Sequence, residues 1–257
     1  MDIVLIGSGN VATVIGRKSV AAGHRILQVY SRNESHANLL ATRLGTVSTS
    51  YISTIERKAD LTLLALRDEA LVPFVKDLGV TSSILAHTAG AVSIGILSSS
   101  AEKYGVLYPL QSLRKEIEKM TPLSMLVDGR GPGVKELLKK FASSVSDIVV
   151  EADDETRLKY HVTATIVNNF TNHLFAAAAS FCEKENISFT VLQPLMEETV
   201  MRLRNMSPAQ VQTGPALRND LITLQKHRDI LQSYPSLLNF YELFTNEIQK
   251  SALSVPR

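Results

Sequence analysis

Six residues near the start of the chain have the types and spacing needed to hold a diphosphate group. They form the pattern G-x-G-x-x-A, written in full as Gly7-Ser8-Gly9-Asn10-Val11-Ala12. In such a loop the first glycine permits a tight turn and the second lets the backbone approach the diphosphate, while the last small residue lets helix and strand pack closely. A strand-like run precedes the pattern and a helix-like run follows it. This context favours a dinucleotide-binding loop over a plain glycine turn.

A second group of residues bears on which dinucleotide is bound. Chains that bind NAD usually carry an acidic residue at the end of the second strand, where it contacts the ribose hydroxyls. This chain has Ser31 and Arg32 there instead. A guanidinium pairs well with the 2′-phosphate of NADP, and a carboxylate would repel it. Glu34 is close enough to be the missing acid, so the pattern favours NADP and leaves NAD as the alternative.

A polar stripe in the second half of the chain could carry proton transfer. At helical periodicity its residues fall within an arc of about 100°, and they are His161, Thr165, Asn168, Asn169 and Asn172. A solvent-facing stripe usually carries Lys and Glu, whereas uncharged hydrogen-bonding groups suit a ligand cleft. We expect His161 to exchange the substrate proton and Asn169 to orient the substrate, with Thr165 and Asn172 as secondary contacts. The alternative is a polar seam between packed helices.

Other candidate residues follow predicted strands, because ligands of open α/β sheets bind outside the carboxyl ends of the strands. Leu66 and Arg67 follow one strand and are expected to contact the cofactor. His87 follows the next, and either binds beside the cofactor as a second proton donor or is only a structural histidine. Gln111 follows a later strand and is a candidate substrate contact. We expect His161 and Asn169 to line the same pocket as Gly9 and His87.

Alternating strands and helices must position these residues. Strands are predicted at 2–6, 26–30, 61–66, 84–86, 106–108, 124–127 and 147–150, and helices at 10–22, 35–44 and 133–143. This alternation predicts βαβ units, and hence an α/β doubly wound, mostly parallel sheet of the Rossmann type.

The pattern becomes helical throughout after Asp153. Helices are predicted at 153–184, 189–204, 220–231 and 236–252, and a helix start at Ser207-Pro208. The sequence therefore predicts a nucleotide-binding domain over residues 1–152 and an all-α substrate or dimerisation domain over 153–257. A homodimer through the second domain is expected, because the Ala176–Ala179 run permits close helix approach and Phe170, Phe175 and Phe181 offer apolar surface.

Composition excludes several classes of protein. The chain has 257 residues, a formal net charge of +2 and 45% hydrophobic residues, which is typical of a globular protein and not of a nucleic-acid binder. A single cysteine, Cys182, excludes an intrachain disulfide, and no Cys/His cluster has metal-ligand spacing. No apolar run is long enough to span a bilayer. We expect a cytoplasmic protein that binds neither metal, membrane nor nucleic acid.

Several motifs resemble one superfamily of oxidoreductases. Besides the glycine loop, they are His87-Thr88-Ala89-Gly90, Tyr108-Pro109-Leu110-Gln111, His161 with Asn169, and Gly214–Asp220. The superfamily includes pyrroline carboxylate reductases, deazaflavin-dependent NADP reductases and 6-phosphogluconate dehydrogenase-like proteins, and the chain most resembles a sparsely characterised NADP oxidoreductase branch. Lys159 is followed four residues later by Thr163, where the hydroxyacid dehydrogenases have asparagine, so their lysine mechanism is not carried over.

The resemblance implies an NADP-dependent oxidoreductase acting on a small carbonyl, imine or hydroxyacid compound. A non-catalytic NADP-binding regulator is the alternative, and it would need no proton donor beside the nicotinamide. Hydride transfer between NADP and a deazaflavin is a third hypothesis.

Overall fold

The computed structural model describes residues 1–117 and 122–254 of the chain. These form two compact units, Met1–Phe170 and Thr171–Arg257. The division falls inside the predicted helical domain, at the end of a helical segment that begins at Asp154. The functional boundary between residues 152 and 153 stays a prediction.

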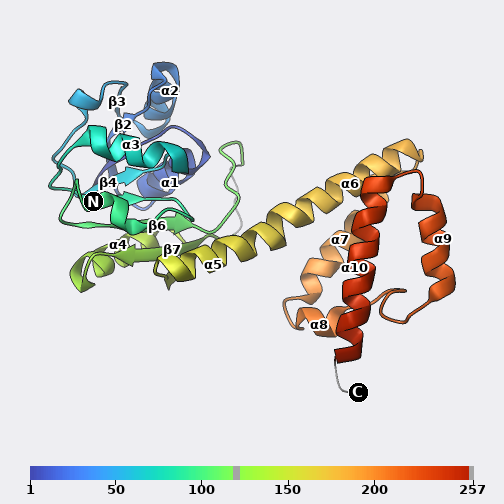
Figure 1. Ribbon diagram of the computed structural model, residues 1–257. Helices are drawn as coiled ribbons and strands as arrows, with labels where there is room; N and C mark the ends of the chain where they lie inside the picture. The colour runs from blue at the N-terminus through green and yellow to red at the C-terminus, as the bar shows by residue number, and fades with distance from the viewer. Residues whose placement is uncertain (118–121, 255–257) are drawn as a thin grey trace. The chain divides into compact units, whose positions relative to one another are not determined.

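An eight-stranded sheet is the centre of the first unit (Figure 1). Its strands are β1 (Asp2–Ile6), β2 (Arg25–Tyr30), β3 (Val47–Thr49), β4 (Leu61–Leu64), β5 (Ile84–His87), β6 (Tyr104–Pro109), β7 (Ser124–Gly129) and β8 (Ile148–Glu151). Their spatial order is β3-β2-β1-β4-β5-β6-β7-β8, and only the β6–β7 pair is antiparallel. The predicted doubly wound, mostly parallel sheet is confirmed.

Helices cover both faces of this sheet. The helical elements between the strands are α1 (Asn10–Ala21), α2 (Glu34–Leu44), η1 (Ile52–Thr54), α3 (Asp68–Leu78), η2 (Ile94–Leu97) and α4 (Pro132–Val145). Ile3 and Leu5 of β1 pack into one core with α1, α2 and α4, whereas Val4 and Ile6 pack into a second core with α3 and η2. Successive side chains of a strand point to opposite faces, so a strand buried on both faces is apolar throughout.

A strand and an α-helix of the first unit were not predicted, nor were the short helices η1 and η2. The strand β3 has three residues, and only its neighbour β2 pairs with it. The helix α3 contains Pro73 in its interior. Proline removes a backbone donor and usually ends a helix, yet Leu71, Phe74, Val75 and Leu78 bury one face of α3.

The predicted long helix over 153–184 has three parts. Its first part, α5, runs over Asp154–Ala164, and Asp153 caps it by accepting a hydrogen bond from the backbone N–H of Thr156 at 2.8 Å. The next six residues, Thr165–Phe170, form the π-helix η3. The third part, α6 (Thr171–Lys184), belongs to the second unit. The sequence predicts the extent of this helical run but not its wider middle turn.

The described part of the second unit is helical, as predicted. After α6 it has η4 (Phe189–Leu192), α7 (Gln193–Arg202), α8 (Pro208–Val211), α9 (Leu221–Leu231) and α10 (Pro235–Ser254). Ser207 and Gln210 form a capping box at α8, which confirms the predicted helix start.

Candidate functional site

The glycine loop joins β1 to α1. Its first residue, Gly7, has a backbone conformation and surroundings that only glycine suits. Its φ of +117° suits glycine, and a Cβ there would lie 2.3 Å from the carbonyl oxygen of Ala65. Its N–H donates to the carbonyl of Tyr30 at 2.7 Å. Gly7 therefore permits the tight turn between β1, β2 and the segment after β4, in agreement with the role that the fingerprint predicts for it.

Gly9 differs from Gly7 because it faces open space. It caps the N-terminus of α1, it is exposed, and no heavy atom lies within 4 Å of an added Cβ. No acidic residue lies in the first turn of α1 and no side chain caps it. The free N–H groups of such a turn bind anions such as phosphate. These observations fit a diphosphate that approaches the backbone at Gly9 and the first residues of α1.

Other residues hold the start of α1 in place. The side-chain oxygen of Asn10 accepts a hydrogen bond from the N–H of Lys115 at 3.3 Å, so a segment after β6 lies beside the loop. Val11 is half-buried against the first core, and Ala12 is fully buried. Gly16 lets α1 pack tightly against α2, since a Cβ there would lie 2.8 Å from Cδ1 of Leu44. The sequence analysis did not identify Gly16.

The end of β2 lies beside this loop. The hydroxyl of Ser8 donates to the hydroxyl of Ser31 at 2.9 Å, which ties the glycine loop to the segment that would face the ribose. Arg32 is exposed. Glu34 is the first residue of α2, where the helix dipole stabilises a carboxylate. The arrangement leaves Arg32 available to a phosphate and gives Glu34 a helix-stabilising role.

Leu66 and Arg67 follow β4 at the same edge of the sheet. Leu66 is half-buried and packs against the second core. Arg67 is the N-cap residue of α3 and its guanidinium lies 3.9 Å from the carboxylate of Glu69, with both side chains mostly exposed. An exposed pair of this kind contributes little to stability, so Arg67 remains free to contact a ligand.

His87 is at the carboxyl end of β5 but is completely buried. Its Nδ1 accepts a hydrogen bond from the N–H of Ala89 at 3.2 Å. Burial, reinforced by the positive charge of Arg157, lowers the pKa of His87 to about 4. His87 is therefore neutral near pH 7, which suits a structural role better than that of a proton donor.

Arg157 of α5 is the largest fully buried side chain, with 1% of its surface exposed. Its Nε donates to the carbonyl of Gly90 at 3.2 Å and its Nη2 to the carbonyl of Val92 at 2.6 Å. Asp154 completes the arrangement, since its carboxylate lies 2.6 Å from Nη2 and also accepts from the hydroxyl of Ser93. Arg157 thus attaches α5 to the loop after β5.

A cavity of about 490 Å³ lies between the segment after β6 and the face of α5 and η3. Its polar lining residues are Tyr108, Gln111, Ser112, Tyr160, His161, Thr163, Thr165, Asn168 and Asn169. Tyr108 and His161 meet directly, with Oη 2.8 Å from Nδ1. Burial raises the pKa of Tyr108, and the charge of Asp68 adds to this rise. The cavity therefore combines a hydroxyl, an imidazole and several amides, which can bind an uncharged polar ligand and exchange a proton with it.

Three residues of the predicted polar stripe, Thr165, Asn168 and Asn169, lie in the π-helix η3. Asn168 and Asn169 are exposed within η3, and π-helical turns are frequent at functional sites. The hydroxyl of Thr165 donates to the carbonyl of His161 at 3.0 Å. The hydrogen of Thr165 is therefore used within the helix, and its oxygen can only accept from a ligand.

Of the four residues that we expected to share one pocket, two line this cavity, His161 and Asn169. Gly9 and His87 are not among its lining residues, so the cavity does not bring the four together. Burial of His87 behind the loop after β5 explains its exclusion. Asn172 is exposed in the second unit, and its role stays a prediction. Sequence reasoning missed Tyr108 as the partner of His161, because a contact between residues 53 positions apart has no local signal.

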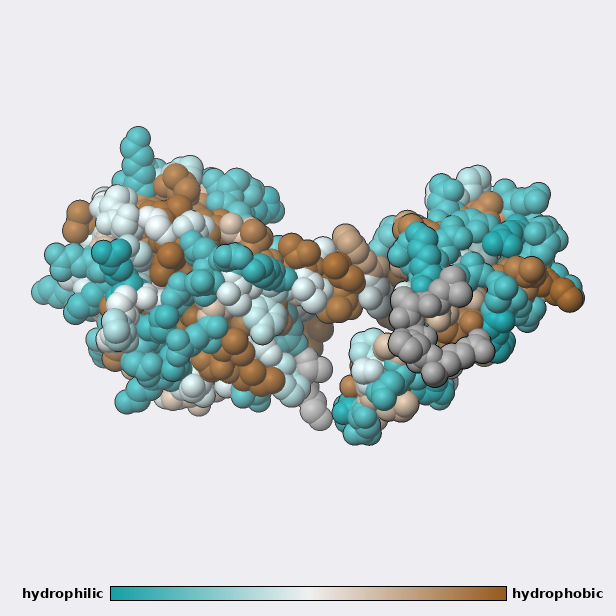
Figure 2. All heavy atoms as spheres, turned by 60° about the horizontal axis from the view of Figure 1, so that its bottom comes forward, coloured by the Kyte–Doolittle hydropathy of each residue, from teal (hydrophilic) through white to brown (hydrophobic). Residues whose placement is uncertain are grey.

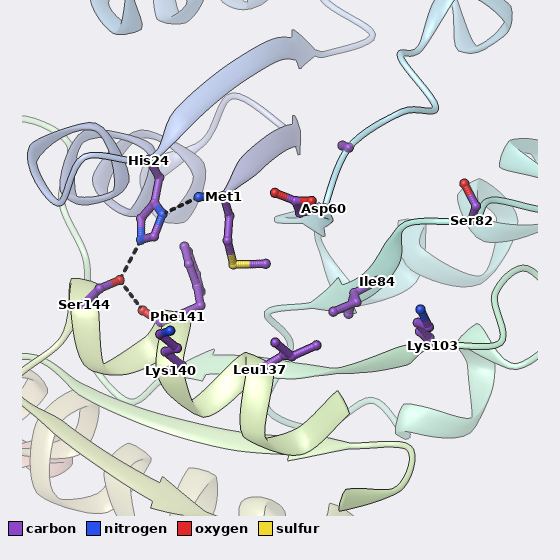
Figure 3. A pocket seen from close by; sticks show the side chains of 11 residues that line it. Met1, His24, Asp60, Ser82, Ile84, Lys103, Leu137, Lys140, Phe141 and Ser144 are labelled. Atoms are coloured by element: carbon purple, nitrogen blue, oxygen red, sulfur yellow. Dashed lines mark hydrogen bonds between the residues drawn. The ribbon is translucent and has the colours of Figure 1, made fainter. Parts of the chain in front are cut away.

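A second cavity, of about 550 Å³, lies at the opposite edge of the sheet (Figure 3). His24, one of its lining residues, joins Met1 to Ser144. Its Nδ1 lies 3.0 Å from the amino nitrogen of Met1, and its Nε2 lies 2.7 Å from the hydroxyl oxygen of Ser144. Met1, Asp60 and Ile84 mark the amino ends of β1, β4 and β5. Ligands of open α/β sheets bind at the carboxyl ends, so this larger cavity is not the candidate site.

Among the described residues, no group of three or more His, Cys, Asp or Glu is arranged to hold a metal ion. Within the same residues, no helix has the length and apolar character required to cross a membrane.

The fold and the glycine loop define the class of protein: a Rossmann-type nucleotide-binding protein with a helical second unit. Residues 1–111 match the family model described as a Rossmann-like domain, and residues 123–248 match the domain of unknown function DUF2520. No curated protein matches the chain.

Solved structures place it more closely. A Bacteroides fragilis protein provisionally named as an NADP oxidoreductase is 32% identical, with a TM-score of 0.89 over 97% of this chain and 98% of that one. The chain belongs to the family of NADP oxidoreductases that this protein represents, with a Rossmann-like domain followed by DUF2520.

More distant structures share the fold. A pyrroline-5-carboxylate reductase from Streptococcus pyogenes is 14% identical, with a TM-score of 0.66 over 97% of this chain and 98% of that one. An imine reductase from Myxococcus stipitatus, solved with NADP+, is 9% identical, with a TM-score of 0.69 over 99% and 95% of the two chains.

Proposed function

We propose that this protein uses NADPH to reduce the C=N or C=O bond of a small molecule, or catalyses the reverse oxidation of an amine or hydroxyacid. The observation that carries the proposal is the cavity beside His161, in the same unit as the glycine loop. The names of its structural neighbours, which are reductases of pyrroline carboxylate and of imines, support it.

The residues of the first unit suit NADP(H). Gly9 offers an open backbone and Ser31 is held against the glycine loop, while Arg32 is exposed beside them. In this proposal Gly7, Ser8, Asn10 and Val11 shape the loop that holds the diphosphate. Leu66 and Arg67 would contact the cofactor at the end of β4. When bound, NADPH supplies the hydride.

The cavity residues have separate roles in the proposal. His161 gives the substrate nitrogen or oxygen its proton, since it is the imidazole that lines the cavity and an imidazole can both donate and accept a proton. Asn169 and Gln111 orient the substrate through their amides, and Thr165 accepts a hydrogen bond from it. His87 is placed behind this site, where its neutral ring supports the loop that ends at Gly90.

Turnover of a panel of imines, carbonyls and hydroxyacids with NADPH or NADP+ tests the proposal. Gly9→Ala should fold normally, since the added methyl meets no protein atom, but should weaken NADPH binding because the methyl lies where the diphosphate approaches. His161→Ala should lower turnover by roughly 10²–10⁴-fold with NADPH affinity unchanged.

Two results would overturn the proposal. One is Gly9→Ala binding NADPH as tightly as the unaltered protein, and the other is full turnover by a folded His161→Ala variant. A cofactor that binds without any turnover across the panel would favour a non-catalytic NADP-binding regulator.

We further propose a homodimer formed through the second unit. Among the side chains of the unit that the structure describes, few are buried, namely Cys182, Ala216, Leu224, Leu231 and Thr245. Many apolar side chains of the unit are exposed instead, including Val191 at 75% and Ile222 at 73%, and Figure 2 shows apolar residues at its surface. Of the phenylalanines that suggested a dimer, Phe181 packs against Tyr234, while Phe175 stays 38% exposed.

A further inference from the structure

Tyr108 and His161 form a pair built from distant parts of the chain. Tyr108 is in β6 and His161 is in α5, 53 residues later, and their rings meet edge to face with centroids 5.8 Å apart. The hydroxyl oxygen of Tyr108 lies 2.8 Å from Nδ1 of His161. Both side chains are half-buried and line the 490 Å³ cavity.

The pair has its geometry because Gly90 lacks a side chain. A Cβ at Gly90 would lie 2.8 Å from Nδ1 of His161 and 2.9 Å from Cζ of Tyr108. Gly90 is itself fixed, since its carbonyl accepts a hydrogen bond from the buried Arg157 at 3.2 Å. The pair is thus held from three sides, by β6, by α5 and by the loop after β5.

This packing distinguishes the two ring nitrogens of His161. Nδ1 faces the protein, where Gly90 and Tyr108 meet it. Nε2 is on the far side of the ring and has no hydrogen-bond partner among the described residues. Burial raises the pKa of Tyr108, so its hydroxyl keeps its hydrogen near neutral pH. The hydroxyl can therefore donate to Nδ1 when the ring is neutral and accept from it when the ring is charged.

We propose that Tyr108 is a positioning residue that holds His161 through Nδ1, so that Nε2 is the atom that exchanges a proton with the substrate. This inference rests on the proposed reductase function and deepens it. It assigns the transferred proton to Nε2 of His161, and it gives Gly90 and Tyr108 the same role, which is to fix the orientation of the His161 ring.

The proton balance of the reduction is complete with this arrangement. The charged ring of His161 donates its Nδ1–H to the Tyr108 hydroxyl oxygen and presents its Nε2–H to the substrate. With NADPH bound to supply the hydride for the new C–H bond, Nε2 would give its proton to the nitrogen or oxygen of the C=N or C=O group, which receives the π electrons. The ring is left neutral, with hydrogen on Nδ1, and a solvent proton at Nε2 restores it.

A double-mutant cycle tests the inference. Tyr108→Phe removes only the hydroxyl, and we expect kcat to fall about 10-fold, whereas His161→Gln should lower it by roughly 10²–10⁴-fold. The double variant should be no slower than His161→Gln alone, because a residue that acts only through His161 has no effect once His161 is gone. KM for NADPH should not change in either single variant.

The second unit supplies a matched control. His227 and Tyr241 form a pair of the same geometry, with Nδ1 and Oη 2.8 Å apart and ring centroids 5.7 Å apart. Tyr241→Phe removes the same atom from the same kind of pair, and should leave kcat unchanged.

A ¹⁵N NMR measurement tests the pairing without any substrate. Tyr108→Phe should shift the Nδ1 resonance of His161 and leave His227 unaltered, and Tyr241→Phe should do the reverse. A His161 resonance that Tyr108→Phe does not move would overturn the inference even if the protein is an active reductase. So would additive losses in the cycle, which would mean that Tyr108 acts on the substrate by itself. If the NMR result holds and no compound is turned over, the proposed function has failed instead, and the assignment of Nε2 as a catalytic atom falls with it.

Discussion

At the scale of single residues, the proposed function depends on Arg32 for the choice of cofactor and on His161 for proton transfer. Arg32 is an exposed cation next to Ser31, and Ser31 is hydrogen-bonded to Ser8 of the glycine loop. Glu34 lies in the first turn of α2, where its carboxylate stabilises the helix. His87 and His161 differ in their surroundings, since His87 is fully buried and His161 lines a cavity. Their environments differ although their residue type is the same, and this difference is the reason why we assign the proton transfer to His161 in the proposed function.

Arg32→Ala should remove most of the preference for NADPH over NADH. The loss of one charge-assisted contact to the 2′-phosphate costs about 1.5–3 kcal/mol, or roughly 10- to 150-fold in affinity. Fluorescence titration with both cofactors measures this, and Arg43→Ala, which removes a cation from the last turn of α2, is the control. Equal affinity of the unaltered protein for both cofactors would contradict the assignment and indicate that Glu34 binds the ribose.

The burial of His87 makes stability depend on pH. Its pKa is lowered to about 4 in the folded protein from an ordinary value of 6.5, mainly by burial. Between these values the unfolded chain binds a proton that the folded chain does not, so stability falls as pH falls through this window. At pH 5 the contribution is on the order of 2 kcal/mol relative to pH 7.

His87→Asn tests this, since its side-chain oxygen can still accept from the Ala89 N–H. Urea unfolding followed by circular dichroism should show a smaller loss of stability between pH 7 and pH 5 in the variant. The exposed His36, changed to Asn, is the control. An identical loss in His87→Asn and in the unaltered protein would show that other groups cause the pH dependence.

At the scale of elements, the site depends on how α5 is attached to the loop after β5. Arg157 is buried and donates to the carbonyls of Gly90 and Val92, so it sets the position of Gly90 against His161. The i,i+3 ion pair with Asp154 keeps its charge compensated. The helix α5 therefore carries both His161 and Arg157, the residue that attaches α5 to the loop beside His161.

Arg157→Ala should destabilise the protein by about 3–5 kcal/mol, because it leaves buried groups without partners. Lys159→Ala, two residues later on α5, breaks only the exposed pair with Glu155 and should cost no more than about 1 kcal/mol. Chemical denaturation of both variants gives the comparison. A change below 1 kcal/mol for Arg157→Ala would mean that the loop holds its position without this side chain.

The sequence predicts elements of this protein better than it predicts their partners. The glycine loop and all strands of the central sheet except β3 can be predicted because their signals are local, namely glycine spacing and continuous apolar runs. The helix α3 was missed since Pro73 argues against a helix, and the buried face of α3 has the larger effect. A periodicity of 100° per residue assumes an α-helix and cannot detect the π-helical turn that carries Asn168 and Asn169.

Local sequence patterns do not predict which side chains form hydrogen bonds with distant parts of the chain. An arginine on a helix is expected to face solvent. Arg157 is buried instead because it donates to two backbone carbonyls that are more than 60 residues away in the chain. The pairing of Tyr108 with His161 depends in the same way on how the sheet brings distant segments together. The sequence predicts which residues are candidates for the site, but it does not predict which of their side chains are in contact.

At the scale of the whole molecule, the two units differ in how they bury apolar side chains. Each face of the sheet in the first unit has its own core, and strand residues such as Val4 and Leu85 are fully buried. Most residues of α7 and α9 in the second unit are exposed, apolar ones included. Exposed apolar patches of this extent mark interaction surfaces, and a closed dimer of identical chains is the commonest solution.

The chain should therefore be a homodimer at micromolar concentration, as measured by light scattering coupled to size exclusion. Val191→Asp and Ile222→Asp should each shift the population toward monomer, because a charge would be buried without a partner in the interface. Val80→Asp is the matched control, since Val80 is 80% exposed in the first unit and should leave the dimer intact. A monomer in the unaltered protein would contradict the proposal, and a dimer that survives both substitutions in the second unit would place the interface elsewhere. Dissociation by Val80→Asp, with no effect of the other two, would place it on the sheet-containing unit.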